Sequence, residues 1–348
     1  MKIVEWEPIL ITKKVFVSDK LNRIVSLVQL AGFLFFGFCY YVSSDYVILY
    51  YPLIISSFLL GIPHGAADHL FIWGFGKFSI PQKIFSLLIY IALCSCYIFL
   101  WLNFPLLGFF LFLLLTCYHW GSGDYIYDLM SGRLSRNDHS CNIFYSLYKG
   151  SIPLVVPGVF HTDSYNMFIT SICTAIDESL ALHPLQISRG FFVATICTSF
   201  VLYRLAFFLC SKRDSSIKIY KFESYESIGL VFWFALLPPI YAIGVYFMFW
   251  HSLRHILRIF LLDGKCLDQK TQYRLKPLLV RYLQLFTVMT ISTFILYLIF
   301  FAYLGLKITD ENVVNILLIL IAGLTFPHTV TVTIMDYRQI NGHNCALN

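Results

Sequence analysis

The chain has 348 residues, of which 58% are hydrophobic and 13% are charged, and its mean hydropathy is +0.73. Soluble domains carry about twice this share of charged residues, so the composition excludes an ordinary soluble protein. The net charge of +6 indicates no nucleic-acid partner, because membrane proteins concentrate Lys and Arg in their cytoplasmic loops.

Apolar stretches long enough to cross a bilayer follow one another along the chain. They predict an all-α fold, a polytopic transmembrane helical bundle that forms one integral-membrane domain over residues 1–348. Residues 1–23 precede the bundle as a cytoplasmic segment, and residues 336–348 follow it as a short tail. The predicted spans are 24–42, 46–62, 83–103, 104–120, 190–210, 228–250, 278–304 and 313–335.

The stretch 142–182 is ambiguous, because Lys149, Pro153 and Pro157 interrupt its apolar part. A re-entrant pair, a hairpin of two spans and a single span all fit the pattern.

Charge favours an even number of crossings for 142–182. That choice places 18 Lys and Arg on the side of the N-terminus and 5 on the other. A single crossing would put the seven basic residues between Arg254 and Arg281 outside, against the positive-inside rule. The sequence therefore predicts eight to ten helices with both termini cytoplasmic, in a multi-pass protein of the inner (plasma) membrane.

Histidines stand near the ends of several spans. His251 and His255 are four residues apart, which puts both rings on one face of a helix. His64 ends the second span and His119 the fourth, and an Asp follows each of them, four residues later in the first case and five in the second.

A metal-bound histidine usually donates its second N–H to a carboxylate. Asp68 and Asp124 are therefore candidates to orient the histidines that precede them; the alternative is two polar helix ends at the membrane interface. Gly65, Gly121 and Gly123 favour close packing of these helix ends.

Even parity brings these histidines, together with His328 near the end of the last span, to one side of the membrane. Several neutral imidazoles without a thiolate suit a first-row metal that keeps open positions. Iron(II) fits this better than zinc, which prefers four ligands or three and a water. His69 lies about 140° round a helix from His64, so the two cannot share one metal if the segment is helical.

Four motifs resemble those of the Brp/Blh family of membrane β-carotene 15,15'-dioxygenases, and they occur in the family's order. They are Gly61-Ile-Pro-His-Gly-Ala-Ala-Asp-His-Leu70, His119-Trp-Gly-Ser-Gly-Asp124, Phe249-Trp-His-Ser-Leu-Arg-His255 and Pro327-His328.

The resemblance implies an Fe(2+) centre held by His64, His119, His251 and His255. It leaves His328 open, as a substrate contact or as a residue behind the ligands. It also implies cleavage of the central double bond of β-carotene with O2 to give two molecules of retinal, in membrane lipid and in many organisms for a retinal-binding rhodopsin. The 18% aromatic content is compatible with a polyene tunnel.

Two other functions stay open at this point. HxxxxH at 64–69 and HxxxH at 251–255 also occur in di-iron membrane hydroxylases and desaturases, which metal stoichiometry would distinguish. A non-enzymatic transporter or rhodopsin-assembly protein would use the histidines as proton relays, and bound iron with a colour change on adding carotene would argue against it.

Overall fold

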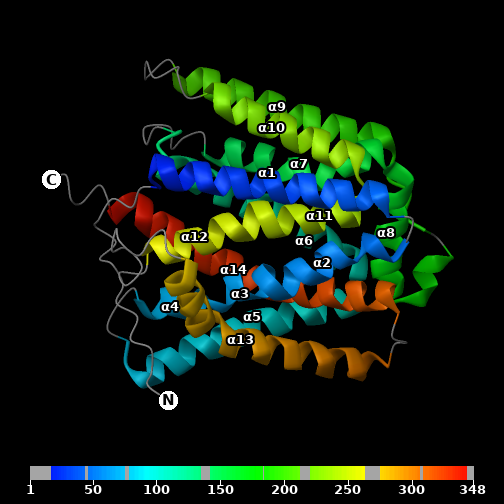
Figure 1. Ribbon diagram of the computed structural model, residues 1–348. Coiled ribbons are helices and arrows are strands. Elements are labelled where there is room, and N and C mark those ends of the chain that lie inside the picture. The colour runs from blue at the N-terminus through cyan, green and yellow to red at the C-terminus, as the bar shows by residue number, and fades with distance from the viewer. Residues whose placement is uncertain are drawn as a thin grey trace.

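The computed structural model describes residues 17–43, 46–74, 78–134, 142–182, 184–211, 220–262, 275–305 and 309–342. Within these ranges the fold is all-helical and contains no strand, which confirms the predicted fold class. The helices run side by side in one bundle (Figure 1). The long ones are α1 (Asp19–Val42), α5 (Ile80–Asn103), α6 (Pro105–Met130), α7 (Asn142–Phe160), α9 (Arg189–Ser211), α10 (Tyr220–Leu236), α13 (Leu275–Leu304) and α14 (Asp310–Gly342).

Shorter elements complete two further rods and one end of the bundle. The first rod contains α2 (Tyr51–Ser56), η2 (Ser57–Gly61), α3 (Ile62–Ala66) and α4 (Asp68–Gly74). The second contains α11 (Pro239–Tyr246), η6 (Phe247–Ser252) and α12 (Leu253–Leu262). The remaining short elements are η1 (Tyr46–Leu49), α8 (Thr162–Thr174) and η4 (Glu178–Ala181).

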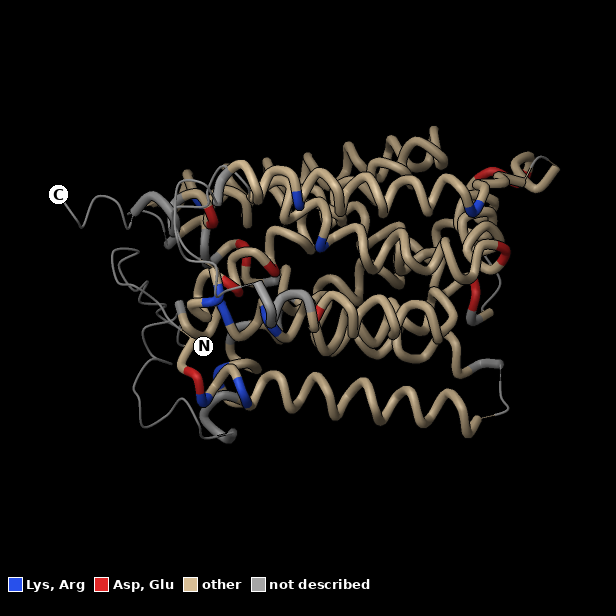
Figure 2. The backbone as a smooth tube through the Cα atoms, turned by 90° about the horizontal axis from the view of Figure 1, so that it is seen from above, with Lys and Arg blue, Asp and Glu red and all other residues tan. Residues whose placement is uncertain are grey.

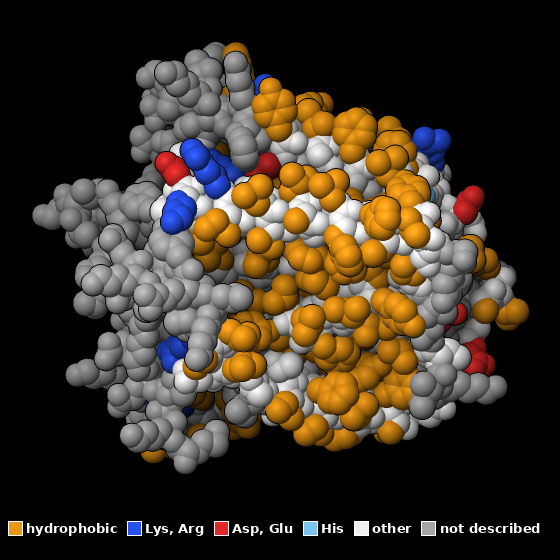
Figure 3. All heavy atoms as spheres, viewed as in Figure 1, with side chains coloured by type: hydrophobic (Ala, Val, Ile, Leu, Met, Phe, Trp, Pro, Cys, Tyr) orange, Lys and Arg blue, Asp and Glu red, His pale blue; other side chains and the backbone are white. Residues whose placement is uncertain are grey.

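The surface of the bundle is that of a membrane protein. Six helices in the described part of the chain (α1, α5, α6, α7, α9 and α14) are long and apolar enough to cross a bilayer, and apolar parts of α10 and α13 are shorter. Hydrophobic side chains cover the face between the two ends (Figure 3). In α14, 67% of the most apolar window is buried, against 11% in α9, so α14 is an inner helix and α9 an outer one.

The packing of α6 on α7 rests on two glycines. A Cβ at Gly121 would lie 1.7 Å from the carbonyl oxygen of Ser146, and a Cβ at Gly150 would lie 1.8 Å from that of Cys117. The two backbones therefore touch, as small residues allow in membrane helices. This contact fixes the part of α6 that carries His119.

The structure departs from the predicted spans in two places. Residues 142–182 form one long helix, α7, and then the short α8, which lies at one end of the bundle (Figure 1). The predicted span 228–250 is divided at Pro238 and Pro239, which lack the N–H groups needed to continue a helix. The rings of Phe234 and Tyr246 are 5.6 Å apart, whereas twelve residues of one helix would separate them by roughly 18 Å.

The helices α10 and α11 therefore form an antiparallel hairpin. The two departures cancel, because 142–182 runs along the bundle once instead of an even number of times, and 220–262 runs along it twice instead of once. His251 and His255 consequently still lie beside His64, as the predicted parity requires.

The two ends of the bundle differ in charge, and Lys and Arg gather at the end where α14 finishes (Figure 2). The predicted topology puts segment 211–227, with its four basic residues, on the other side. However, α9 ends and α10 begins at the same end as the end of α14 (Figure 1); residues 212–219 themselves lie outside the described ranges. At the opposite end, α9 begins with Arg189, and the three residues 306–308 between α13 and α14, which include Lys307, lie outside the described ranges.

We therefore expect reporters fused after residues 215 and 348 to be cytoplasmic, and one fused after residue 307 to be external, because basic segments stay inside. Green fluorescent protein fluoresces in the cytoplasm and alkaline phosphatase is active outside it, so paired fusions give opposite readouts at each position. Phosphatase activity after residue 215 would contradict the arrangement of α9 and α10.

Candidate metal centre

Five histidines from five elements meet in the interior of the bundle. Their exposed fractions are between 3% and 5%, and neighbouring ring centroids are 4.7 to 6.4 Å apart. They are His64 on α3, His119 on α6, His251 in η6, His255 on α12 and His328 on α14. Ligand atoms of His64, His119 and His328 all lie within 4.8 Å of one another, so these three buried side chains could hold a metal ion.

The local backbone explains how the sequence brings these rings together. His251 lies in the π-helical turn η6, and a second π-helical turn, η2, ends two residues before Pro63. Such turns are rare and often mark functional sites, because they redirect side chains by one position. His64 and His328 each follow a proline inside the chain's helical rods, where the missing N–H loosens the helix locally.

The donor atoms of the cluster fit a metal. Both ring nitrogens of His119, and Nε2 of His251, His255 and His328, are buried and have no hydrogen-bond partner among the described residues. Buried polar atoms in native proteins are nearly always paired. Imidazole nitrogens left free and aimed at one another are what a first-row metal ion requires of its ligands.

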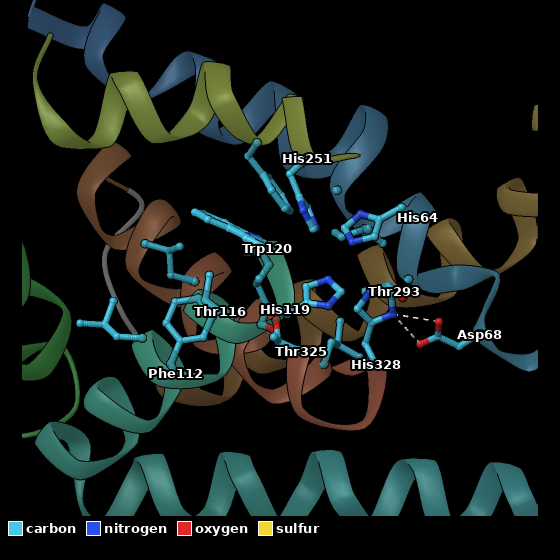
Figure 4. Close-up of a pocket in the computed structure, with 18 of the residues that line it drawn as sticks. His64, Asp68, Phe112, Thr116, His119, Trp120, His251, Thr293, Thr325 and His328 are labelled. Carbon is cyan, nitrogen blue, oxygen red and sulfur yellow. Dashed lines mark hydrogen bonds and ion pairs between the residues drawn. The ribbon is translucent and has the colours of Figure 1, made fainter. Parts of the chain in front are cut away.

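His328 is held by a carboxylate that the sequence assigned to a different histidine. Its Nδ1 lies 2.8 Å from both oxygens of Asp68 (Figure 4), and Tyr90 on α5 donates a hydrogen bond of 2.8 Å to the same carboxylate. His64, the predicted partner of Asp68, instead places Nδ1 3.2 Å from the Leu60 carbonyl oxygen. The carboxylate–histidine arrangement typical of metal ligands therefore belongs to His328.

Asp124 does not contact a histidine in the way the sequence predicts. Its carboxylate accepts hydrogen bonds from Nε1 of Trp250 at 3.1 Å and from Arg254 at 2.9 Å. The buried guanidinium of Arg254 attracts the carboxylate, and it also pairs with Glu226 at 3.0 Å. Asp124 therefore neutralises a buried cation beside the cluster.

His69 stands apart from the five-ring cluster. Its ring packs on Trp73 at a centroid distance of 5.0 Å, as the helical spacing from His64 predicts. A Cβ at Gly65 would lie 3.7 Å from the ring of His328, and a Cβ at Gly123 would lie 3.8 Å from the ring of His251. Both distances are ordinary van der Waals contacts. These two glycines leave room for the rings, and close backbone approach occurs only at Gly121 among the three predicted positions.

A cavity of about 210 Å³ reaches the histidine cluster, and its wall is mostly apolar and aromatic. Figure 4 shows His64, His119, His251 and His328 facing this space, with Phe112 and Thr116 on one side of the cluster and Asp68 on the other. An apolar cavity with a few convergent polar groups is the usual form of a small-molecule site. The ligand that suits it is a hydrophobic molecule whose reactive part stops beside the histidines.

The fold and this site define a helical membrane protein whose buried histidine centre could hold a metal next to an apolar cavity. Residues 55–336 match the family described as Beta-carotene 15,15'-dioxygenase. The chain belongs to this family, and it is a carotenoid dioxygenase. The family match confirms the resemblance that the four histidine motifs indicate.

Similar proteins carry the same description. The probable beta-carotene 15,15'-dioxygenase Blh of Halobacterium salinarum is 26% identical over 301 residues, which are 83% of this chain and 85% of the relative. The beta-carotene 15,15'-dioxygenase of an uncultured marine bacterium is 25% identical over 211 residues, 56% of this chain and 64% of the relative. The probable beta-carotene 15,15'-dioxygenase Brp of Halobacterium salinarum is 24% identical over 132 residues, 36% of this chain and 34% of the relative. No solved structure matches the chain.

Proposed function

We propose that this protein cleaves the central 15,15' double bond of β-carotene with O2 and releases two molecules of retinal, in the plasma membrane. The observation that carries the proposal is the cluster of five buried histidines, four of which line an apolar cavity among membrane helices. In this reaction one C=C bond and one O–O bond break and two C=O bonds form. Atoms and electrons therefore balance without a reductant or a proton donor.

The metal that we propose is iron(II). His64, His119, His251 and His255 are the predicted ligands, and the free Nε2 of His328, with its Nδ1 on Asp68, supports adding this ring to the set. Bound iron(II) would activate O2, which in its triplet ground state does not react readily with a closed-shell polyene. The protein's own contribution is to hold neutral rings in fixed orientations and to keep water out of the cavity.

The geometry supports one metal rather than two. The five rings form one cluster, since the ring centroid of His64 lies 5.0 to 6.4 Å from those of the other four, and ligand atoms of His64, His119 and His328 lie within 4.8 Å of one another. Two iron ions in a membrane enzyme need about eight histidine or carboxylate ligands. The cluster offers five histidines. The ring of His69 packs on Trp73 instead of entering the cluster. The HxxxxH pair, His64 and His69, therefore does not form a second metal site.

Expression in a bacterium that makes β-carotene tests the proposal. Loss of the orange pigment with appearance of retinal in the extract is the expected result, together with about one iron per chain in the purified protein. A transport or assembly role would leave the pigment intact. Two irons per chain with hydroxylated or desaturated carotenoid would indicate the di-iron alternative. A retinal-binding rhodopsin is the natural recipient of the product.

Replacing Asp68 by Asn is expected to weaken iron binding about 10- to 100-fold, the usual effect of removing a carboxylate behind a metal-bound histidine. The reason is that His328 loses the charged acceptor of its Nδ1–H. Titration of the metal-free protein with Fe(2+) under anaerobic conditions measures the affinity. Tyr90→Phe, which removes only the second hydrogen bond to Asp68, serves as the milder comparison, and equal affinity in all three proteins would exclude the proposed role of Asp68.

A further inference from the structure

The cavity extends from the histidines along two helices in the same direction. Each of these helices presents residues 3, 7 and 10 positions before its histidine, a spacing that keeps them on one helix face. Before His119 on α6 these are Thr116, Phe112 and Phe109, and before His328 on α14 they are Thr325, Ile321 and Leu318.

A third helical rod repeats the pattern. Phe247, Ile243 and Ile240 precede His251 by 4, 8 and 11 residues and line the same cavity. Ten residues of helix extend roughly 15 Å. Three independent rods therefore define an arm of the cavity, about 15 Å deep, that starts at the histidine cluster and runs toward the end of the bundle where α8 lies.

The helix α8 closes this arm. Tyr165, Phe168 and Ile172 are spaced by three and four residues, so they form one face of α8, and all three line the cavity. Tyr165 and Ile172 are 2% and 1% exposed, and the Tyr165 ring packs on that of Phe192 at 5.2 Å. The closed end of the arm is therefore a packed apolar wall, which we call the α8 floor and define by Tyr165, Phe168 and Ile172.

The other side of the histidine cluster has a different character. There the cavity is lined by residues of α4, α5 and α13, and Leu87 on α5 is 42% exposed on the outer surface. Ser86, Trp73 and Thr293 nearby are half-buried. The cavity is thus closed toward α8 and reaches the membrane-facing surface beside α5.

We infer that the closed arm receives one ring-bearing half of the carotenoid and that the α8 floor sets which double bond lies beside the histidines. The inference rests on the proposed function and names the subsite that decides the cleavage position. From the central double bond of β-carotene to the far edge of its ring is roughly 15 Å, at about 1.2 Å per bond of an extended chain plus the ring itself. This length equals the depth of the arm, so a ring seated against the floor leaves the central bond at the cluster.

A carotenoid with a ring at one end only provides the first test. If the distance from the seated ring selects the bond, β-apo-8′-carotenal is cleaved at the same 15,15' position and yields retinal and a short dialdehyde. If the enzyme instead measures from both ends, this substrate is cleaved elsewhere or not at all. Either of those results overturns the inference.

Substitutions of the floor provide the second test. Ile172→Ala and Phe168→Ala deepen the arm, and the ring-bearing product from it is expected to become longer than retinal, with the retinal share falling to less than half. Ile172→Phe makes the arm shallower and is expected to give a shorter product. Met167→Ala is the matched control, because Met167 lies on the same helix, is 71% exposed and does not line the cavity.

Ligand binding to the metal-free protein gives a readout that is independent of turnover. Retinal bound in the arm lies near Trp101 and Trp120, which line the cavity, so it quenches tryptophan fluorescence. Ile172→Phe is expected to weaken retinal binding at least tenfold and to leave the binding of the shorter β-ionone within twofold, whereas Met167→Ala changes neither. Unchanged retinal affinity and unchanged products in all floor variants would overturn the inference. The proposed function would still stand in that case, provided that the wild-type protein makes retinal. A wild-type protein that makes no retinal removes the proposed function itself.

Discussion

Alanine in place of His119 is expected to remove the bound metal and to abolish retinal formation. His119 is 3% exposed, and neither of its ring nitrogens has a hydrogen-bond partner among the described residues, so a bound metal would account for these two buried nitrogens. Its centroid lies 4.7 Å from His328 and 4.9 Å from His251, at the heart of the cluster. Iron content of the purified variant and pigment analysis of the expressing cells measure the two effects.

His161→Gln is the matched control for this experiment. His161 lies between α7 and α8, where Nε2 is 3.1 Å from the carbonyl oxygen of Ala235, and a glutamine amide can donate a comparable bond. This variant is expected to keep its iron and its activity. Single alanine variants of His251 and His255 are expected to resemble His119→Ala. Full iron content in any of the three cluster variants would show that the ring concerned is not a ligand.

The histidine cluster could be predicted from sequence because its members end apolar stretches. A histidine at the end of a membrane span is costly unless it is paired or bound, and the parity of the spans puts such ends at one depth. The prediction survived two errors in the span assignment. The dipeptide Pro238-Pro239 marked the second error in advance, since two prolines in the middle of one predicted span interrupt its hydrogen bonding.

The partners behind the cluster could not be predicted in the same way. Asp68 is four residues from His64 but contacts His328, 260 residues away, and Tyr90 is one of two tyrosines in the apolar helix α5. Local spacing carries no information about such contacts, because they depend on which helices become neighbours. The sequence likewise did not distinguish the short helix α8 from part of a membrane span. Its place at the closed end of the cavity is seen only in the fold.

Glu226 is a further residue that sequence reasoning missed. It joins two arginines from separate elements, with Arg133 at 2.8 Å and Arg254 at 3.0 Å. Arg133 also contacts Asp128 at 3.1 Å. The carboxylates and guanidinium groups form a connected network that ties the hairpin of α10 and α11 to α6, close to the histidines. Two glutamates, Glu223 and Glu226, precede the apolar stretch, and the sequence gives no sign that the second has this role.

Replacing Arg254 by alanine is expected to destabilise the protein by about 3–5 kcal/mol, the cost of leaving the partner of a buried ion pair without its counter-charge. Arg254 is 4% exposed. Its guanidinium group lies 3.7 Å from the ring centroid of Trp250 and 4.5 Å from that of Tyr127, so cation–π contacts are lost as well. Arg254→Lys should restore little, because a single ammonium group cannot engage two carboxylates and stack on a ring in the same way.

The half-life of the folded protein in detergent at a fixed elevated temperature is the appropriate measure, since large membrane proteins unfold irreversibly. Arg204→Ala, on the exposed side of α9, is the matched control and is expected to keep the wild-type half-life. Adding Asp124→Asn to Arg254→Ala should lengthen the half-life again, because Asp124 loses its paired cation in the single variant, whereas Glu226 keeps Arg133 at 2.8 Å. If the double variant instead decays faster than Arg254→Ala alone, the unpaired Asp124 charge is not the source of the instability, and Arg254 stabilises the hairpin mainly through its contacts with Trp250 and Tyr127.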